Sequence, residues 1–212
     1  MKKGVLVCLI FTLMTNLFAQ NKESIVLNQP SKDRGKTVIN ALWQRASERE
    51  FDTTRVSYQD LSDLLWAANG INRPETGMRT ASSAMNSQDI DIFVFKETGV
   101  YIYNAQQHIL ELVVKGDNRK LFSVQEKYPH PPLIFLLVSN ISRFSRGENA
   151  QKLEWAAIDA GIVAQNILLF CTSIDMVGRP RAGMNKELIK ELLSLNETQF
   201  PLLNIPVSYK KE

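Results

Sequence analysis

The sequence predicts one domain that mixes helices with β-strands, and three observations support this fold class. The chain has 212 residues, 44% apolar and 22% charged, which suits a single domain with a real core. Ile90 to Phe95 alternates in polarity, and a Glu97-Thr98-Gly99 turn leads to a return strand over Val100 to Tyr103, which predicts a hairpin. Asn149 to Thr172 has helical spacing and is apolar on nearly all sides in its second half, which predicts a buried helix. In a chain of this size, a dimer interface is a natural place to bury it.

The N-terminus has a different composition. Lys2 and Lys3 precede an almost wholly apolar run over Val5 to Phe18, and Ala19-Gln20 follows as a cleavage point. This order is typical of a secretory signal peptide, so residues 1–19 are expected to direct export to the periplasm and to be removed. The run is short for a membrane span, and no stable span is expected after cleavage. An uncleaved membrane anchor stays open as an alternative.

The charge and cysteine content narrow the function classes. Cleavage would leave 23 Lys and Arg against 22 Asp and Glu, a near-neutral balance that argues against a nucleic-acid binder. Only Cys171 would remain, so the core must hold the fold without an internal disulfide. His108 and His130 are the only histidines, so no metal site is expected.

The remaining elements follow in order after a polar lead-in over residues 20–36. Helical spacing predicts a helix over Thr37 to Glu50, and Ser57 begins a second helix that Asn69-Gly70 ends. Ile71 to Met85 is expected to be a long binding loop. In the middle of the chain, we expect a strand over His108 to Val114, a short helix over Arg119 to Gln125 and a strand buried on both faces over Leu133 to Val138. Toward the C-terminus, we expect a loop over Val177 to Gly183, a helix over Asn185 to Leu195 and an extended segment over Asn204 to Tyr209.

One candidate binding segment follows the first predicted helical stripe. Arg45 and Arg49 are four residues apart and could share a helical face, with Ser47 between them. Guanidinium groups and a hydroxyl are suitable donors for a phosphate. The alternative is a solvated helix face whose arginines are neutralised by Glu48 and Glu50.

Two later segments are also candidates. The run Arg79 to Gln88 has small residues that allow a flat ligand to approach, and its amides suit the edge of a heteroaromatic ring. Met176 to Gly183 combines glycines with arginines. The alternatives are an ordinary polar loop for the first and a plain connection between helices for the second.

Several motifs are absent. The sequence has no Gly-x-Gly-x-x-Gly fingerprint, no phosphate-binding P-loop and no Gly-x-Ser-x-Gly elbow. A doubly wound dinucleotide fold, a P-loop enzyme and a hydrolase are therefore unsupported.

Four runs in order resemble the nitroreductase family, and in particular its SagB-type dehydrogenase branch. They are Leu61 to Arg73, Arg79 to Ala84, Gly99 to Tyr103 and Ala160 to Leu169. The resemblance covers about residues 37 to 210 and defines one domain over 37–212. It implies an α+β fold with a mostly antiparallel central sheet flanked by helices, in an interlocked homodimer that holds FMN at its interface.

The resemblance also implies site residues. It places the FMN phosphate against Arg45, Ser47 and Arg49, with a further basic contact at Lys210 and main-chain contacts from Val177 and Gly178. The ring system would lie along residues of the second subunit, namely Ser82, Ser83, Ala84, Asn86 and Gln88. The chain departs from the family pattern at Ser82, where proline is usual, at Ala46, where arginine is usual, and at Ser208, where glycine is usual.

The function that the resemblance implies is FMN-dependent oxidoreduction. Flavin N5 would pass a hydride to or from a small organic substrate, with NAD(P)H or another electron donor as partner. Asn86 and Gln88 are the candidates for donors at the flavin edge, and no general acid or base is assigned. Tyr101 and Tyr103 are expected to be packing residues of the hairpin. The alternative is an exported, non-catalytic flavin- or ligand-binding protein on the same scaffold.

Overall fold

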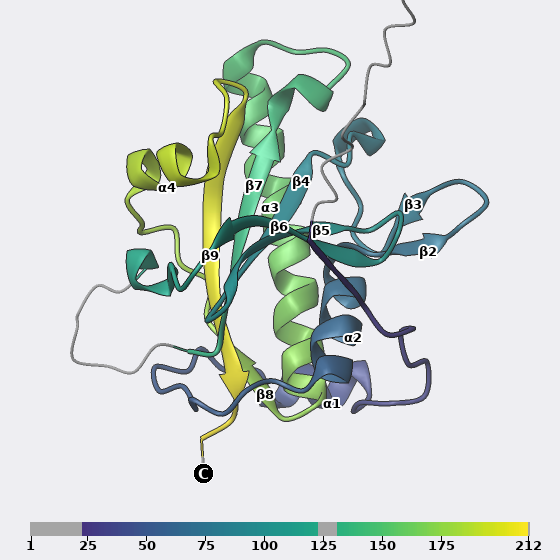
Figure 1. The fold of residues 1–212 in the computed structure, drawn as a ribbon. Helices are drawn as coiled ribbons and strands as arrows, with labels where there is room; N and C mark the ends of the chain where they lie inside the picture. Colours follow the sequence, from purple (N-terminus) through teal and green to yellow (C-terminus); the bar gives the residue numbers. More distant parts are fainter. Residues whose placement is uncertain (1–22, 123–130, 212) are drawn as a thin grey trace, which may run out of the picture.

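A seven-stranded antiparallel sheet forms the centre of the molecule in the order β1-β6-β5-β4-β7-β9-β8 (Figure 1). The computed structural model describes residues 23–122 and 131–211. The predicted signal segment and His130 lie outside these residues. The strands are β1 (Ser24–Val26), β4 (Ile90–Lys96), β5 (Gly99–Asn104), β6 (Ile109–Lys115), β7 (Leu133–Asn140), β8 (Met176–Gly178) and β9 (Gln199–Tyr209). The predicted α+β class with a mostly antiparallel sheet is confirmed.

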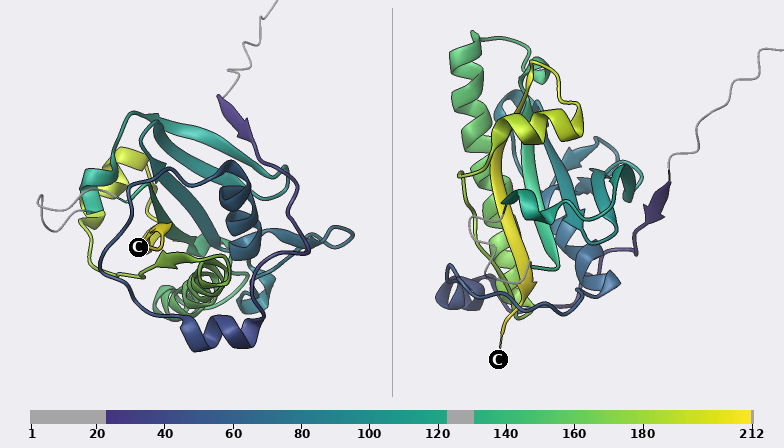
Figure 2. Two further views of the ribbon diagram at one scale, coloured as in Figure 1. Left: turned by 90° about the horizontal axis from the view of Figure 1, so that it is seen from below. Right: turned by 60° about the vertical axis from the view of Figure 1, so that its left-hand side comes forward.

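Helices cover both faces of this sheet. Helices α2 (Tyr58–Asn69) and α3 (Asn149–Ser173) pack on one face, α1 (Val38–Gln44) lies outside against α3, and α4 (Lys186–Leu193) covers part of the other face (Figure 2). Because side chains alternate along a strand, Ile92 and Val94 of β4 enter the α2/α3 core, while Phe93 and Phe95 enter the α4 core. Double burial explains the unbroken apolar run of β7 over Leu133 to Val138.

Helix α2 begins and ends where its sequence predicts. The Ser57 hydroxyl accepts the Asp60 N–H at 3.0 Å, and the Gly70 N–H donates to the Trp66 carbonyl at 2.8 Å. Local hydrogen bonds therefore satisfy backbone groups at both ends of α2, and this fixes where the following segment begins. The structure likewise confirms the helices α3 and α4, the hairpin formed by β4 and β5, the strands β6 and β7, and the extended C-terminal segment. Only the ends of these elements differ slightly from the prediction.

The helix predicted over Thr37 to Glu50 is too long by six residues. α1 ends at Gln44, and Arg45 has an extended ψ of 121°, so Arg45 and Arg49 do not share a helical face. The chain leaves the helix because β9 holds the following segment: the Ser208 hydroxyl accepts the Asp52 N–H at 3.1 Å. A tertiary contact thus overrides a helical pattern.

Two predicted loops contain strands. The segment from Ile71 to Met85 forms a small hairpin of β2 (Ile71–Arg73) and β3 (Met78–Arg79), and then a 3₁₀ turn at Ala84–Asn86. The segment predicted as a loop from Val177 begins with β8, which pairs with β9 at the edge of the sheet. The short helix expected from Arg119 is a 3₁₀ turn over Arg119–Phe122, and the rest of that prediction lies outside the described residues.

By length and composition alone, α3 could cross a membrane. In the structure its buried stripe, which includes Ala156, Ala160, Val163 and Ile167, packs against α2 and the sheet. Its apolar character is thus used for the protein core.

Candidate functional site

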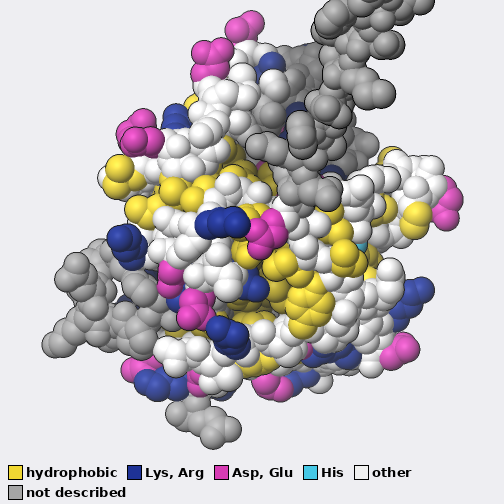
Figure 3. Space-filling model, viewed as in Figure 1, with side chains coloured by type: hydrophobic (Ala, Val, Ile, Leu, Met, Phe, Trp, Pro, Cys, Tyr) yellow, Lys and Arg dark blue, Asp and Glu magenta, His cyan; other side chains and the backbone are white. Residues whose placement is uncertain are grey.

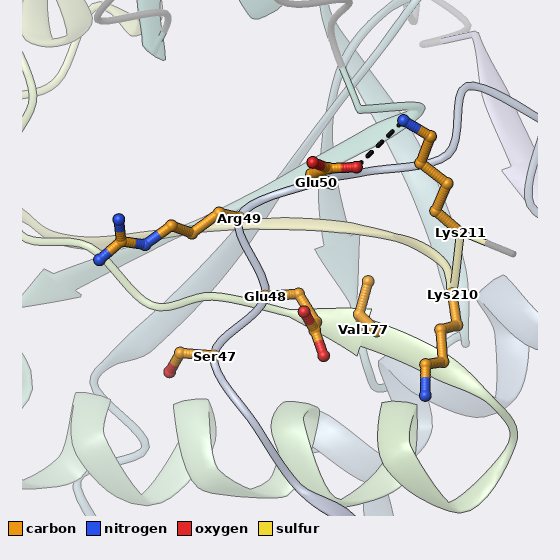
Figure 4. Close-up of a pocket in the computed structure, with 7 residues that line it drawn as sticks. All are labelled: Ser47, Glu48, Arg49, Glu50, Val177, Lys210 and Lys211. Carbon is orange, nitrogen blue, oxygen red and sulfur yellow. Dashed lines mark hydrogen bonds and ion pairs between the residues drawn. The ribbon is translucent and has the colours of Figure 1, made fainter.

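A basic cavity of about 450 Å³ lies where three distant segments meet (Figure 4). We use this name for the cavity lined by Ser47, Glu48, Arg49, Glu50, Val177, Lys210 and Lys211. The first four residues come from the segment after α1, Val177 comes from β8, and the two lysines directly follow β9. The fold therefore brings together Ser47, Arg49 and Lys210, which are expected to bind the FMN phosphate, and Val177, which is expected to make a main-chain contact.

The charges of the basic cavity leave cations free for a ligand. Lys211 pairs with Glu50 at 3.1 Å, which neutralises both. No carboxylate of the described residues lies within ion-pair distance of Arg49 or Lys210, and both side chains are exposed. In Figure 4, Arg49 extends along one side of the cavity and Lys210 approaches from the other, with the Glu48 carboxylate between them. An anionic group bound to these two cations would meet three or more N–H donors.

Backbone contacts fix the walls of the basic cavity. The Lys210 N–H donates to the Asp175 carbonyl at 3.1 Å, and the Ser57 N–H donates to the Tyr209 hydroxyl at 2.8 Å. Ser208, which replaces the family's usual glycine, is fully buried and holds Asp52. This departure therefore has a structural role beside the cavity.

Arg45 and Gly178 do not line the basic cavity. Arg45 is half-buried at the C-terminal cap of α1, two residues before the first lining residue. Gly178 packs under the cavity wall, where an added Cβ would approach Leu168 Cδ2 to 3.2 Å. Its small size serves the packing of β8 on α3.

The other predicted residues form the Ser82–Gln88 loop, which contains a strained backbone. Met85, Asn86 and Gln88 have φ angles of 55°, 52° and 48°, in the left-handed region that non-glycine residues usually avoid. Strain of this kind persists only where the surroundings impose it, and it is common in ligand-binding segments.

Hydrogen bonds from several elements hold this loop. The Gln88 N–H donates to the Ser83 hydroxyl at 2.9 Å, and the Arg79 Nε donates to the Gln88 side-chain oxygen at 2.9 Å. Arg143 donates to the Gln88 carbonyl at 2.9 Å while it pairs with Asp91. The amide of Gln88 is thus committed to Arg79 within this chain, and the side chains of Ser82 and Asn86 are the more exposed ones.

Two buried carboxyl groups beneath the loop were not predicted from the sequence. Asp159 of α3 and Asp89 are 2% and 0% exposed and lie within hydrogen-bonding reach of each other. The Ala84 N–H donates to both carboxyl oxygens of Asp159, at 2.9 and 3.1 Å. Burial and the neighbouring Asp89 raise the pKa of Asp159 to about 7.

The basic cavity and the Ser82–Gln88 loop do not meet within one chain. The loop is attached to α3 at Asp159, whereas β8 packs on α3 at Leu168. Nine residues of helix separate these points, about 14 Å along the axis at 1.5 Å per residue. Figure 1 shows β8 and α1 at one end of α3 and the start of β4 nearer its other end.

Exposed apolar side chains mark the outer side of α1 and α3. We call Val38, Ile39, Leu42 and Trp43 of α1, together with Ile158 in the first half of α3 and farther from α1, the α1–α3 face. Trp43 is 84% exposed, and the other four side chains are 50–68% exposed. The face shown in Figure 3 is different, because there Lys, Arg, Asp and Glu side chains interrupt the apolar ones. A cluster of exposed large apolar residues next to a cavity is typical of a protein interface.

Comparisons with known proteins identify the family of this chain. The model of the nitroreductase family matches residues 42–209. A protein of Methanocaldococcus jannaschii, named as a nitroreductase, is 27% identical over 183 residues, which cover 82% of this chain and 91% of the relative.

Solved structures show the same fold. A structure described as a nitroreductase from Ralstonia eutropha JMP134 superposes with a TM-score of 0.84 and 33% identity, covering 89% of this chain and 90% of the other. A chain of the Escherichia coli microcin synthetase complex has a TM-score of 0.70 at 17% identity, covering 100% of this chain and 85% of the other. The residues matched by the family model include β4 to β9, α2, α3 and the Ser47–Glu50 segment of the basic cavity, and this chain belongs to the nitroreductase family.

Proposed function

We propose that the protein is an exported, FMN-dependent oxidoreductase of the SagB-type branch and that it works as a homodimer. Membership of the nitroreductase family supports an oxidoreductase function, and members of this family typically bind FMN. The observation that carries the proposal is the basic cavity. Arg49 and Lys210, which have no ion pair among the described residues, come from distant parts of the chain and line the same cavity.

The donor set of the basic cavity fits the FMN phosphate. Arg49 supplies a planar guanidinium, Lys210 an ammonium group and Ser47 a hydroxyl. Their side chains are exposed and carry no competing ion pair among the described residues, so binding a phosphate breaks no contact of the fold. Arg45 stands two residues away and would add long-range attraction to this site.

The Ser82–Gln88 loop would face the flavin ring. When bound, FMN would supply the chemistry of hydride transfer between a donor and a small organic acceptor. The protein's part is to hold the ring against the loop, with the exposed Ser82 and Asn86 side chains available as donors. Val177 would contribute its main chain from the cavity side.

A homodimer joins the two regions into one site. The α1 residues of the α1–α3 face lie directly before the basic cavity in sequence, and α1 carries four of the exposed large apolar residues of the described surface. If this face packs on a second copy, the loop of one subunit can reach the cavity of the other. Trp43→Glu should then convert a dimeric mass in light scattering to a monomeric one, while a monomeric wild-type protein would contradict the dimer.

Export is proposed from the N-terminal segment alone. A periplasmic enzyme would use an electron donor other than cytoplasmic NAD(P)H, or would oxidise an external substrate. Mass spectrometry of the protein recovered from the periplasm should show a chain that begins at Gln20; recovery of uncleaved protein in the membrane fraction would favour the anchor.

The activity is tested on purified protein lacking residues 1–19. FMN added to this protein should stay bound and give a flavin absorption spectrum. Dithionite should bleach this spectrum, and a quinone or nitroaromatic compound should restore it. If FMN binds but no acceptor restores the spectrum, the non-catalytic binding protein is the better description. If no FMN binds at micromolar concentration, the oxidoreductase proposal is wrong.

A further inference from the structure

Asp89 and Asp159 are the two carboxyl groups of the described core that lack a cation. The contrast with Asp60 and Asp63 of α2 is direct, because Arg34 bridges both of those acids, at 2.8 Å to Asp63. No ion pair of the described residues includes Asp89 or Asp159. Two buried carboxylates in contact repel each other and are costly to desolvate, so they hold a proton between them.

The charged side chains near Asp89 and Asp159 do not neutralise the two carboxyl groups. Asp91 of β4 faces Asp89 and adds negative charge. Arg143 is bound to Asp91 at 2.8 Å, and Arg79 is directed to Gln88 and to the Asn69 carbonyl. The groups that touch the pair are neutral donors, namely the Ala84 N–H and the hydroxyls of Ser87 and Ser139.

These donors connect the pair to the strained loop. The Ala84 N–H on Asp159 and the Ser87 hydroxyl on Asp89, at 3.3 Å, fix the loop on either side of Met85 and Asn86, whose φ angles are positive. If the pair lost its proton, repulsion between the two carboxylates would separate Asp159 from Asp89. The loop is bound to both, so its left-handed turn would lose one of its two anchors.

We propose that Asp159 and Asp89 are positioning residues that share one proton, and that this proton holds the Ser82–Gln88 loop in the conformation that binds the flavin ring. The proposal rests on the proposed FMN function for the role of the loop. Neither carboxyl group touches the flavin in this account. Binding of FMN therefore becomes linked to the uptake of one proton near neutral pH, since burial and Asp89 raise the pKa of Asp159 to about 7.

The first test needs no flavin. In the purified protein, NMR titration should show the Asp159 side-chain carbonyl carbon and the Ala84 amide proton changing together, with one midpoint near pH 7. The Ala84 change should vanish in Asp159→Asn, because asparagine donates to Asp89 and accepts from Ala84 without titrating. An Asp159 carboxyl that titrates in the range of exposed aspartates, or an Ala84 amide that still titrates in the variant, would overturn the shared proton.

The second test measures FMN affinity against pH. In the wild type, the dissociation constant of FMN should increase at pH values above the titration midpoint. The increase should be at most about tenfold per pH unit, which is the slope for one linked proton. Asp159→Asn should bind as the wild type does at low pH and lose this slope, and the matched control Asp33→Asn, at an exposed position, should keep it. A variant that retains the wild-type slope would refute the link.

The two tests separate the two proposals. Absence of FMN binding at every pH, together with a shared titration of Asp159 and Ala84, would contradict the FMN function and leave the proton-held loop standing. Normal FMN binding with no dependence on Asp159 would contradict the proton-held loop alone.

Discussion

The basic cavity and the Ser82–Gln88 loop offer a ligand two different kinds of surface. The basic cavity has exposed, unpaired cations on long side chains, Arg49 and Lys210, and its walls are backbone segments that need no ligand to hold them. The loop has a strained backbone whose polar groups are already committed to Asp159, Asp89, Arg79 and Arg143. The cavity is suited to attract charge, and the loop is suited to fix geometry. A ligand with a phosphate at one end and a flat ring at the other matches both.

The largest expected effect comes from removing the charge of the cavity. Arg49→Ala with Lys210→Ala should weaken FMN binding at least about 100-fold, because two charge-assisted contacts are worth about 1.5–3 kcal/mol each. Riboflavin, which lacks the phosphate, should bind the wild type and the double variant alike. Fluorescence titration with both flavins measures this.

A matched control distinguishes this effect from a general loss of positive charge. Arg55→Ala removes an exposed guanidinium that pairs with Glu97 outside the basic cavity, and FMN affinity should not change. Equal losses in the control and in the double variant would mean that the basic cavity is not the phosphate site.

Removing the support of the loop should have a smaller effect of a different kind. Asp159→Ala leaves the buried Ala84 N–H without its acceptor, which costs about 1–3 kcal/mol of unfolding free energy. It should weaken FMN and riboflavin by the same factor, since both carry the ring. Urea denaturation and flavin titration test this, and a selective loss of FMN would contradict the division of roles.

The pH dependence of stability should follow from the raised pKa of Asp159. The folded protein keeps this proton to about pH 7, whereas unfolded chains release it near pH 4, so the stabilising contribution is complete below about pH 4. Unfolding free energy should therefore fall as pH rises from about 4 to 7, by at most about 1.4 kcal/mol per pH unit from this group. Denaturation series of the wild type and Asp159→Asn give the contribution as a difference, and identical pH profiles would contradict it.

The smallest effect is expected at the strained position itself. Met85 is exposed and has a φ of 55°, so Met85→Gly removes a steric cost and adds a cost in chain entropy. The unfolding free energy should change by less than about 1 kcal/mol. Met85→Val, whose branched side chain resists this conformation, should destabilise the protein more, and the reverse order would show that the loop is not held left-handed.

The sequence predicted elements that are defined by their own periodicity. The strands β4 and β5, the doubly buried β7 and the helices α2 and α3 all follow from local patterns and caps. The end of α1 could not be predicted, because it depends on the Asp52–Ser208 contact between residues 156 positions apart. The β2–β3 hairpin is too short to give a pattern.

The candidate site also has parts that local sequence predicts and parts that only the fold shows. The chemistry of Arg45, Ser47 and Arg49 suggested a phosphate site, and the family resemblance added Lys210. The fold places Ser47, Arg49 and Lys210 around one cavity and leaves Arg45 outside its lining. Lys211 was missed, although it is adjacent to Lys210. Asp159 carried a signal, as an acid inside the apolar stripe of Ala156, Ala160 and Val163, but its partner Asp89 is 70 residues away and only the fold shows it.

The split of one FMN site between two subunits is tested most directly by mixing two defective variants. One carries Arg49→Ala and Lys210→Ala, and the other carries Ser82→Trp, which adds bulk at an exposed loop position. At an FMN concentration near the wild-type dissociation constant, neither homodimer should show FMN binding. After the two are unfolded and refolded together, each mixed dimer should contain one intact site, so about a quarter of the wild-type FMN binding should return. No recovery in verified mixed dimers would contradict a site shared between subunits.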